Sequence, residues 1–176
     1  MQKLRVGLGV LLAALLLTGA GWADDCDRLS APQYADQRIR ACTQAINSGQ
    51  WTGKNQAINY SNRGNAWKHK QELDKAIADY DMAIQAYPQF AMAYYNRGLA
   101  WHAKKEYDKE IADYGKAIEL NPNYAEAYGN RAYVLALQGH YKEALADAKR
   151  GVELDPEGRT KNRAILEWVQ NKAAGK

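Results

Sequence analysis

The sequence repeats itself with a period of 34 residues, and this period constrains the fold more than any other feature. The segment 57–90 aligns with 91–124 without gaps, and about half of the aligned positions are identical. A third, more divergent copy covers 125–158. A fixed period of this length is typical of a solenoid, in which each unit buries its apolar face only against its neighbours.

Each copy predicts two helices joined by a short polar turn. Within each copy, apolar and small residues form two groups, and each group has the i, i+3, i+4, i+7 spacing of one helical face. In the first copy these are Ala57, Tyr60, Gly64 and Trp67, then Leu73, Ala76, Ile77, Tyr80, Ala83 and Ile84. A proline follows each second helix and marks its end. Proline lacks an N–H and disfavours a helical conformation in the residue before it. We therefore predict an all-α chain of helix–turn–helix units.

The order of small and aromatic residues within the period resembles the tetratricopeptide repeat family. The pattern is a small residue, an aromatic, an alanine, an aromatic, an alanine and a proline, and the resemblance covers 57–158. It implies a right-handed α-solenoid of three repeats, 57–90, 91–124 and 125–158. The first helices of the repeats would form its concave face.

One residue of the second repeat departs seriously from the family pattern. Glu110 stands where the pattern asks for a small residue, as Ala76 and Ala144 do in the other copies. A carboxylate buried there would be strongly destabilising unless it were paired. We therefore expect Glu110 either to lean outward along its methylene groups or to meet a neighbouring cation such as Arg97.

The first 23 residues have the pattern of a secretory signal peptide. Lys3 and Arg5 precede an apolar core over 8–17, and 21–23 offers a small-x-small cleavage signal. The core is too short to span a bilayer, which needs about 20 residues. We expect a mature chain, 24–176, that is periplasmic or secreted, without stable membrane insertion. Losing the two cations lowers the formal net charge from +4 to +2, which argues against a dedicated nucleic-acid surface.

Caps are expected at both ends of the repeats. The N-terminal segment, 24–56, is expected to hold an arm, a capping helix over Asp36–Ile46 and a connector over Ser48–Gln56. The C-terminal segment, 159–176, is expected to form a final helix over Thr160–Lys172. This helix would cover the apolar end of the third repeat, as the terminal caps of solenoids must.

The chain has two cysteines, Cys26 and Cys42, so only one intramolecular pairing exists. An exported chain meets an oxidising compartment, where a disulfide is the default. We predict that a Cys26–Cys42 disulfide pins the arm onto the capping helix and stabilises the fold by about 3 kcal/mol. The alternative is a redox-active or metal-binding pair, but the chain has no CxxC motif and no suitably placed third ligand.

Catalytic motifs are absent from the sequence, so we predict a protein that is not an enzyme and needs no cofactor or metal. It contains no GxSxG, HExxH, P-loop or GxGxxG pattern. Its three histidines lie at or near turns about one repeat apart: His69, His102 and His140. That spacing does not bring them together into one metal site.

Asparagines recur once per repeat in a first-helix register that lines the groove of tetratricopeptide repeat proteins: Asn62, Asn96 and Asn130. An amide both donates and accepts hydrogen bonds, so stacked asparagines suit an extended peptide backbone. The alternative is that they bond neighbouring turns or helix ends. The groove registers of the same family add further predicted groove residues: Asn65, Met92, Tyr95, Leu99 and Tyr133.

The carboxylate clamp of the family, which grips acidic C-terminal tails, is not expected in this chain. Asn65 and Asn96 match two of its positions. Ser61, Glu126 and Asn130 stand where its cationic residues should be, and Glu126 would repel a carboxylate. We expect a ligand segment of mixed apolar character instead.

Arginine and aspartate also recur in register, on the first and second helices respectively. The pairs are Arg63 and Asp79, Arg97 and Asp113, and Arg131 and Asp147. The planar fork of arginine suits ion pairs that brace each hairpin. Contact with a ligand is the alternative role.

These features predict a non-catalytic adaptor or scaffold that binds an extended segment of an envelope protein in its concave groove. Because three repeats make a short groove, micromolar affinity is expected. Two alternatives remain open. One is a self-assembling structural module, a homo-oligomer paired through the solenoid ends or the Trp168 helix. The other is an accessory subunit of a cell-envelope complex.

Overall fold

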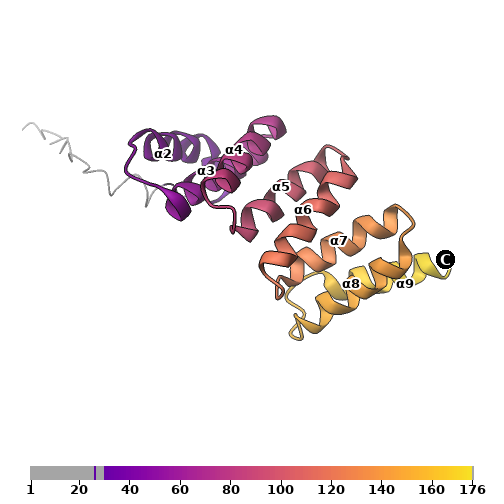
Figure 1. Ribbon diagram of the computed structural model, residues 1–176. Coiled ribbons are helices and arrows are strands. Elements are labelled where there is room, and N and C mark those ends of the chain that lie inside the picture. The colour runs from indigo at the N-terminus through magenta and orange to yellow at the C-terminus, as the bar shows by residue number, and fades with distance from the viewer. Residues whose placement is uncertain (1–25, 27–29, 176) are drawn as a thin grey trace, which may run out of the picture.

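The computed structural model describes Cys26 and residues 30–175, so the predicted signal peptide, 1–23, lies outside the described residues. The described part is all-α, which confirms the predicted fold class. In chain order its helices are the 3₁₀ helix η1 (Pro32–Tyr34), then α2 (Ala35–Asn47), α3 (Gly53–His69), α4 (Leu73–Ala86), α5 (Ala91–Ala103), α6 (Tyr107–Leu120), α7 (Ala125–Leu137), α8 (Tyr141–Glu153) and α9 (Asn162–Ala173). Figure 1 shows them stacked in this order.

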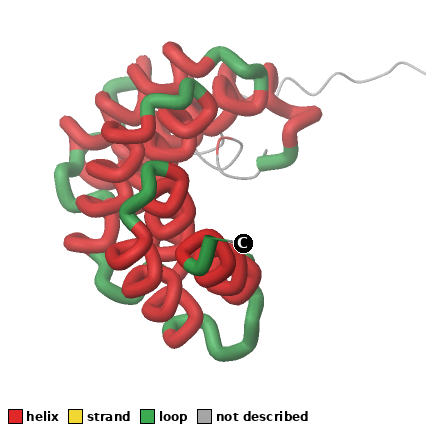
Figure 2. The backbone as a smooth tube through the Cα atoms, turned by 90° about the vertical axis from the view of Figure 1, so that its right-hand side faces the viewer, coloured by secondary structure: helices red, strands yellow, loops and turns green. Residues whose placement is uncertain are grey.

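Consecutive helices pack as hairpins, and the hairpins stack on one another. Helix α3 packs on α4, α5 on α6 and α7 on α8, while the α4–α5 and α6–α7 contacts join one hairpin to the next. Helix α3 also contacts α5, so first helices of adjacent hairpins approach each other. The stack bends into an arc (Figure 2), with α2 packed on one end and α9 on the other. Because α3 contacts α5, and Asn130 of α7 bonds Tyr95 of α5, the first helices lie close together, which places them on the inner side of this arc.

Helix α3 begins at Gly53, one turn before the repeat boundary expected at Ala57. The last residues of the expected connector are therefore helical. The reason lies in the prolines: Pro88 and Pro122 lie just before α5 and α7 and prevent an earlier start, whereas no proline lies in the residues just before α3.

Glycines in the first helices make room for buried tyrosines of the second helices. A Cβ at Gly64 would lie 2.7 Å from Cε1 of Tyr80, and one at Gly98 would lie 2.7 Å from Cε1 of Tyr114. Both rings are buried, at 0% and 1% exposure. The small residue and the aromatic thus fill one shared volume, so the two helices of a hairpin pack closely without a void.

The recurring arginines and aspartates form the intra-repeat ion pairs that were predicted. Each arginine donates two hydrogen bonds to the aspartate of its own hairpin, at distances of 2.6 to 2.8 Å. Arg97 also donates to Asp81, at 2.5 Å, and Arg63 donates to Thr43 of α2, at 3.1 Å. These bidentate contacts fix the two helices of each hairpin and occupy the arginines internally.

The turn inside each hairpin holds one residue in the left-handed region: Gln71 (φ 62°), Lys105 (φ 61°) and Gly139 (φ 84°). A side chain is strained there and glycine is not. Because relief of this strain outweighs the larger unfolded-state entropy of glycine, we predict that Lys105→Gly raises the free energy of unfolding by about 0.5–1 kcal/mol.

The matched change, Gly139→Ala, should lower the free energy of unfolding by a similar amount. A Cβ at Gly139 would meet nothing within 4 Å, so the backbone conformation alone sets the effect. Urea denaturation of both variants measures it. Shifts of the same sign in the two variants would contradict the strain argument.

Candidate functional site

A cavity of about 310 Å³ lies between α5, α6, α7 and the start of α9. It is lined by Leu99, His102, Glu110, Tyr114, Asn130, Tyr133, Lys161 and Ile165. An adjoining cavity of about 360 Å³ shares Asn130, Lys161 and Ile165 with the first and extends to Tyr95 and Glu126. Together the two cavities hollow the surface between the second and third repeats and the C-terminal helix.

The first cavity contains a buried carboxylate. Glu110 is 1% exposed, and His102 Nδ1 lies 2.9 Å from its Oε1 and 3.0 Å from its Oε2. The hydroxyl of Tyr114 shares a further hydrogen bond with it. Glu110 does not lean outward, and its partner is His102 in place of the suggested Arg97, which bonds Asp113 and Asp81. The register that Glu110 shares with Ala76 faces the first helix of its hairpin, which is α5 for Glu110. The carboxylate therefore lies within hydrogen-bonding distance of His102 on α5.

Burial raises the pKa of Glu110 above its usual value of 4.5. Desolvation of the carboxylate is the largest cause, and it outweighs the hydrogen bonds and charge of His102 and the hydrogen bond of Tyr114, which lower the pKa. Burial also raises the pKa of the Tyr114 hydroxyl, with the neighbouring Glu110 charge adding to the effect. The cavity therefore holds a carboxylate whose charge the fold stabilises only in part.

Glu110→Gln is expected to raise the free energy of unfolding at pH 7 by about 1 kcal/mol. The folded pKa of Glu110 lies above its unfolded value, so wild-type stability declines as pH rises from 4.5 through the raised pKa. Glutamine keeps nearly the same shape and carries no charge. The gain should therefore vanish below pH 4.5, and denaturation at pH 4 and pH 7 tests this. A gain of equal size at both pH values would contradict it.

The middle repeat differs from the first at the positions that build this cavity. In the first repeat the hydroxyl of Tyr80 donates to Oδ1 of Asn65, at 2.7 Å. In the second repeat Leu99 stands in the register of Asn65, and Glu110 provides the hydrogen bond to Tyr114. His102 replaces Lys68 in the same way. A position-by-position comparison of the copies is the sequence signal that would have indicated this site.

The predicted groove residues divide into two sets. Leu99, Asn130 and Tyr133 line the first cavity, and Tyr95 lines the second. Asn130 Nδ2 donates to the Tyr95 hydroxyl, at 3.1 Å, and the Tyr95 ring packs between Tyr114 and Tyr124, with centroids 5.6 and 4.8 Å away. These four residues are therefore brought together.

The remaining predicted groove residues lie apart from the two cavities. Asn62 accepts a hydrogen bond from Arg38 Nη2, at 2.7 Å, and Asn65 accepts one from Tyr80. Asn96 is buried at 8% exposure, and Met92 is exposed at 51%. Asn62 and Asn130 thus have different local partners, Arg38 and Tyr95, because the residues that face this register differ from one repeat to the next.

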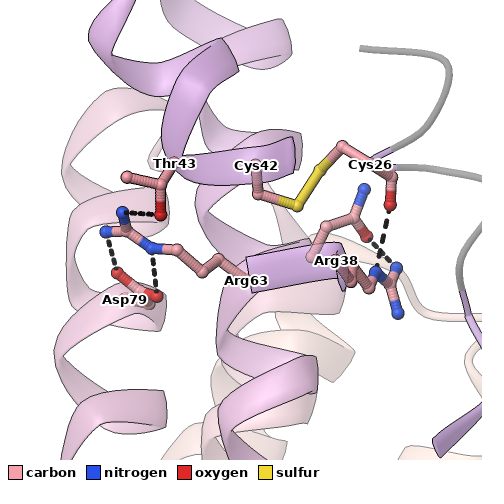
Figure 3. The surroundings of a disulfide bond; sticks show 7 residues. Cys26, Arg38, Cys42, Thr43, Arg63 and Asp79 are labelled. Carbon is pink, nitrogen blue, oxygen red and sulfur yellow. Dashed lines mark hydrogen bonds and ion pairs between the residues drawn. A yellow bond between two sulfur atoms is a disulfide. The ribbon is translucent and has the colours of Figure 1, made fainter. Parts of the chain in front are cut away.

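The N-terminal end of the stack is held by the disulfide that was predicted. Cys26 is bonded to Cys42 of α2, and both cysteines are fully buried. Arg38 Nε donates to the Cys26 carbonyl, at 3.0 Å, while its Nη2 reaches Asn62 of α3 (Figure 3). The same arginine therefore connects the disulfide-bonded segment to the first repeat.

The C-terminal wall of the cavities is anchored by one asparagine. Asn162 is 2% exposed, and its Nδ2 donates to the carbonyls of Ala125, at 2.9 Å, and Gly151, at 2.8 Å. These bonds hold the start of α9 against α7 and α8. They therefore also position Lys161 and Ile165, which line both cavities.

The described part of the chain contains neither a clustered metal site nor a membrane-spanning helix. Among those residues, no group of three or more histidines, cysteines and acids is placed to hold a metal ion. None of their helices is long and apolar enough to cross a membrane.

A stack of helix hairpins with cavities on its inner side defines the chain as an α-solenoid repeat protein. Two overlapping segments, 91–124 and 114–146, match family models of the tetratricopeptide repeat. Residues 91–146 are therefore tetratricopeptide repeats, which confirms the resemblance for this part of the chain. No curated protein sequence matches the chain significantly.

Solved structures with the same architecture include peptide complexes. The first tetratricopeptide repeat domain of Spaghetti (RPAP3), bound to the HSP90 peptide SRMEEVD, is 25% identical, covers 72% of this chain and 99% of its own, and has a TM-score of 0.66. The second such domain of human RPAP3, in complex with the HSP70 peptide SGPTIEEVD, is 27% identical and has a TM-score of 0.61. The match covers 65% of this chain and 95% of that domain. The MamA protein is 20% identical and has a TM-score of 0.73, which shows a shared fold. The match covers 89% of this chain and 82% of the MamA chain.

Proposed function

We propose that this protein is a non-catalytic adaptor that binds an extended segment of a protein partner on the inner side of its second and third repeats. The observation that carries the proposal is the pair of adjoining cavities between α5, α7 and α9. The first cavity has aliphatic and aromatic walls with a few polar groups among them, which is the usual make-up of a recognition site, and the second is lined mostly by polar and charged side chains.

The solved relatives support a peptide as the ligand, because two of them are complexes with short peptides. Those peptides end in acidic residues, and this chain differs in what it offers such a tail. Glu110 and Glu126 place carboxylates at the cavities, beside the exposed cations Lys161 and Arg159, and Asn130 is uncharged. The buried carboxylate of Glu110 would repel an acidic side chain that entered the first cavity, so we propose a segment of different composition.

We further propose that the partner belongs to the cell envelope and that the protein works in the periplasm or is secreted. Two features support this location. The N-terminal sequence has a cationic start and an apolar core followed by a small-x-small signal. The buried Cys26–Cys42 disulfide is of the kind that persists in oxidising compartments.

Site-directed photocrosslinking tests the proposed binding face. A benzophenone amino acid is placed at Tyr133, which lines the first cavity, and in a second variant at Tyr141, at the start of α8. The two tyrosines are equally exposed, at 36%, so they differ in location and not in accessibility. A partner adduct in the envelope fraction is expected from Tyr133 and not from Tyr141.

Two other outcomes would contradict the proposal. Equal adducts from both positions would place the interaction outside the cavities. An adduct of the protein only with itself would favour the self-assembling module.

A further inference from the structure

We propose that the first cavity is a pocket for a basic side chain, so that the bound segment is selected for a lysine or arginine that inserts between Leu99 and Tyr133 to reach Glu110. This inference rests on the proposed function, because it names the chemistry of the segment that the adaptor would bind. It follows from the walls of the cavity, the carboxylate within it and the contrast between the repeats.

The walls of the cavity suit the methylene groups of a long basic side chain. Leu99 and Ile165 are aliphatic, and Tyr114 and Tyr133 are aromatic. Lysine and arginine bury their stems along such surfaces while the charged group seeks a polar partner. Aromatic faces also attract cations directly. A cavity of about 310 Å³ has room for one such side chain.

Glu110 supplies the polar partner. An ionised carboxylate offers about four acceptor positions, and His102 and Tyr114 occupy only part of that capacity. Since the carboxylate is 1% exposed and lines the cavity, a group that completes its hydrogen bonding has to enter the cavity. A cationic donor would do so, and it would replace an unfavourable buried charge with a hydrogen-bonded charge pair.

The other charges around the cavities do not reverse this preference. Glu126, Lys161 and Arg159 are all exposed, so solvent screens the attraction of the first and the repulsion of the other two alike. The charge of Glu110 is buried, so its attraction for a cation is screened less. His102 is the remaining neighbour, and its side chain is 42% exposed, so solvent also screens it in part.

The contrast between the repeats argues that Glu110 is not present for folding. Ala76 and Ala144 occupy its register and are both fully buried, so a small residue satisfies the packing there. A buried carboxylate at this one repeat lowers stability at neutral pH, as derived above. Residues that reduce stability in this way are typical of binding sites.

Selection of peptides by the protein tests the inference. A random peptide library is selected in parallel against the full-length wild type and against Glu110→Gln. This variant keeps the shape of the pocket and is expected to be more stable, so a loss of selectivity cannot result from unfolding. A second variant, Leu99→Asn with Glu110→Ala, reproduces the first repeat and restores an amide partner for Tyr114.

Wild type is expected to enrich peptides with lysine or arginine at one fixed position, by at least about threefold over the starting library. Both variants should still select peptides but lose that enrichment. Peptides selected by wild type without a fixed basic position, or with an acidic one, would overturn the inference and leave the adaptor function standing. Basic enrichment that persists in both variants would also overturn it. Failure of all three proteins to select any peptide would overturn the adaptor function itself.

A synthetic peptide from the wild-type pool then measures the contact. Its N-terminus is acetylated, so a terminal amine cannot occupy the pocket, and its basic residue is exchanged for norleucine. We expect the exchange to weaken binding to wild type about 30-fold and binding to Glu110→Gln less than about threefold. Equal losses for the two proteins would show that the basic residue does not contact Glu110.

Discussion

Gly129→Ala is expected to lower the free energy of unfolding by about 3 kcal/mol, because Asn162 fills the space that the new methyl group would need. A Cβ at Gly129 would lie 1.9 Å from Oδ1 of Asn162 and 2.9 Å from its Cγ. The amide cannot move aside cheaply, since it is buried and donates to the carbonyls of Ala125 and Gly151. Chemical denaturation measures the loss.

The same substitution at Gly115 provides the control for this prediction. Gly115 lies inside α6, and a Cβ there would come no closer than 3.4 Å to the nearest atom, Nη1 of Arg131. Gly115→Ala should therefore be neutral or stabilise by about 0.5–1 kcal/mol through helix propensity. If both glycine variants lost the same stability, close packing at Gly129 would not be the cause.

A double-mutant cycle separates the steric effect from loss of the Asn162 hydrogen bonds. Asn162→Ala alone should destabilise, because the two carbonyls lose their donor. In that background Gly129→Ala should have little further effect, since the obstructing amide is gone. Additive losses from the two substitutions would contradict a direct contact between them.

Replacing Cys26 and Cys42 with serine is expected to lower the free energy of unfolding by about 3 kcal/mol, the loop-closure value for their sequence separation of 16. The loss should be local. Each unit of a solenoid contacts only its neighbours, so hydrogen exchange should accelerate in α2 and the start of α3 while protection in α7 and α8 stays unchanged.

Treatment with a reductant provides the control for the disulfide prediction. Reduced wild type should match the double-serine variant in stability, and the reductant should not affect the variant. Faster exchange throughout all the helices would contradict local stabilisation. Unchanged exchange in α2 would indicate that its packing on α3 suffices without the disulfide.

Much of the architecture could be predicted from the sequence because it depends on local patterns. The spacing of Ala57, Tyr60 and Gly64 defines one helical face without knowledge of any neighbour. Proline positions mark where helices cannot continue, and the helix boundary that moved furthest, at Gly53, has no proline just before it. The Arg63–Asp79 pair and its two counterparts followed from their repetition in register.

The candidate site was only partly predictable. Tyr95, Leu99, Asn130 and Tyr133 were all found through their first-helix registers. Glu110 was noticed as a departure, but Arg97 was named as a neighbouring cation when His102 is the actual partner. Charge alone suggests many partners for a carboxylate. The choice among them depends on where each side chain points across the helix interface, which a linear pattern does not contain.

The sequence by itself determined the repeating unit, its two helices, the braces between them and the single cysteine pairing. Each of these depends on residues close in the chain or on a repeated register. Only the tertiary structure decided how Glu110 is buried, how Asn162 fits beside Gly129 and how α9 closes the cavities. These features depend on three-dimensional contacts between residues of different helices, where a change of one side chain redirects the hydrogen bonds of its neighbours.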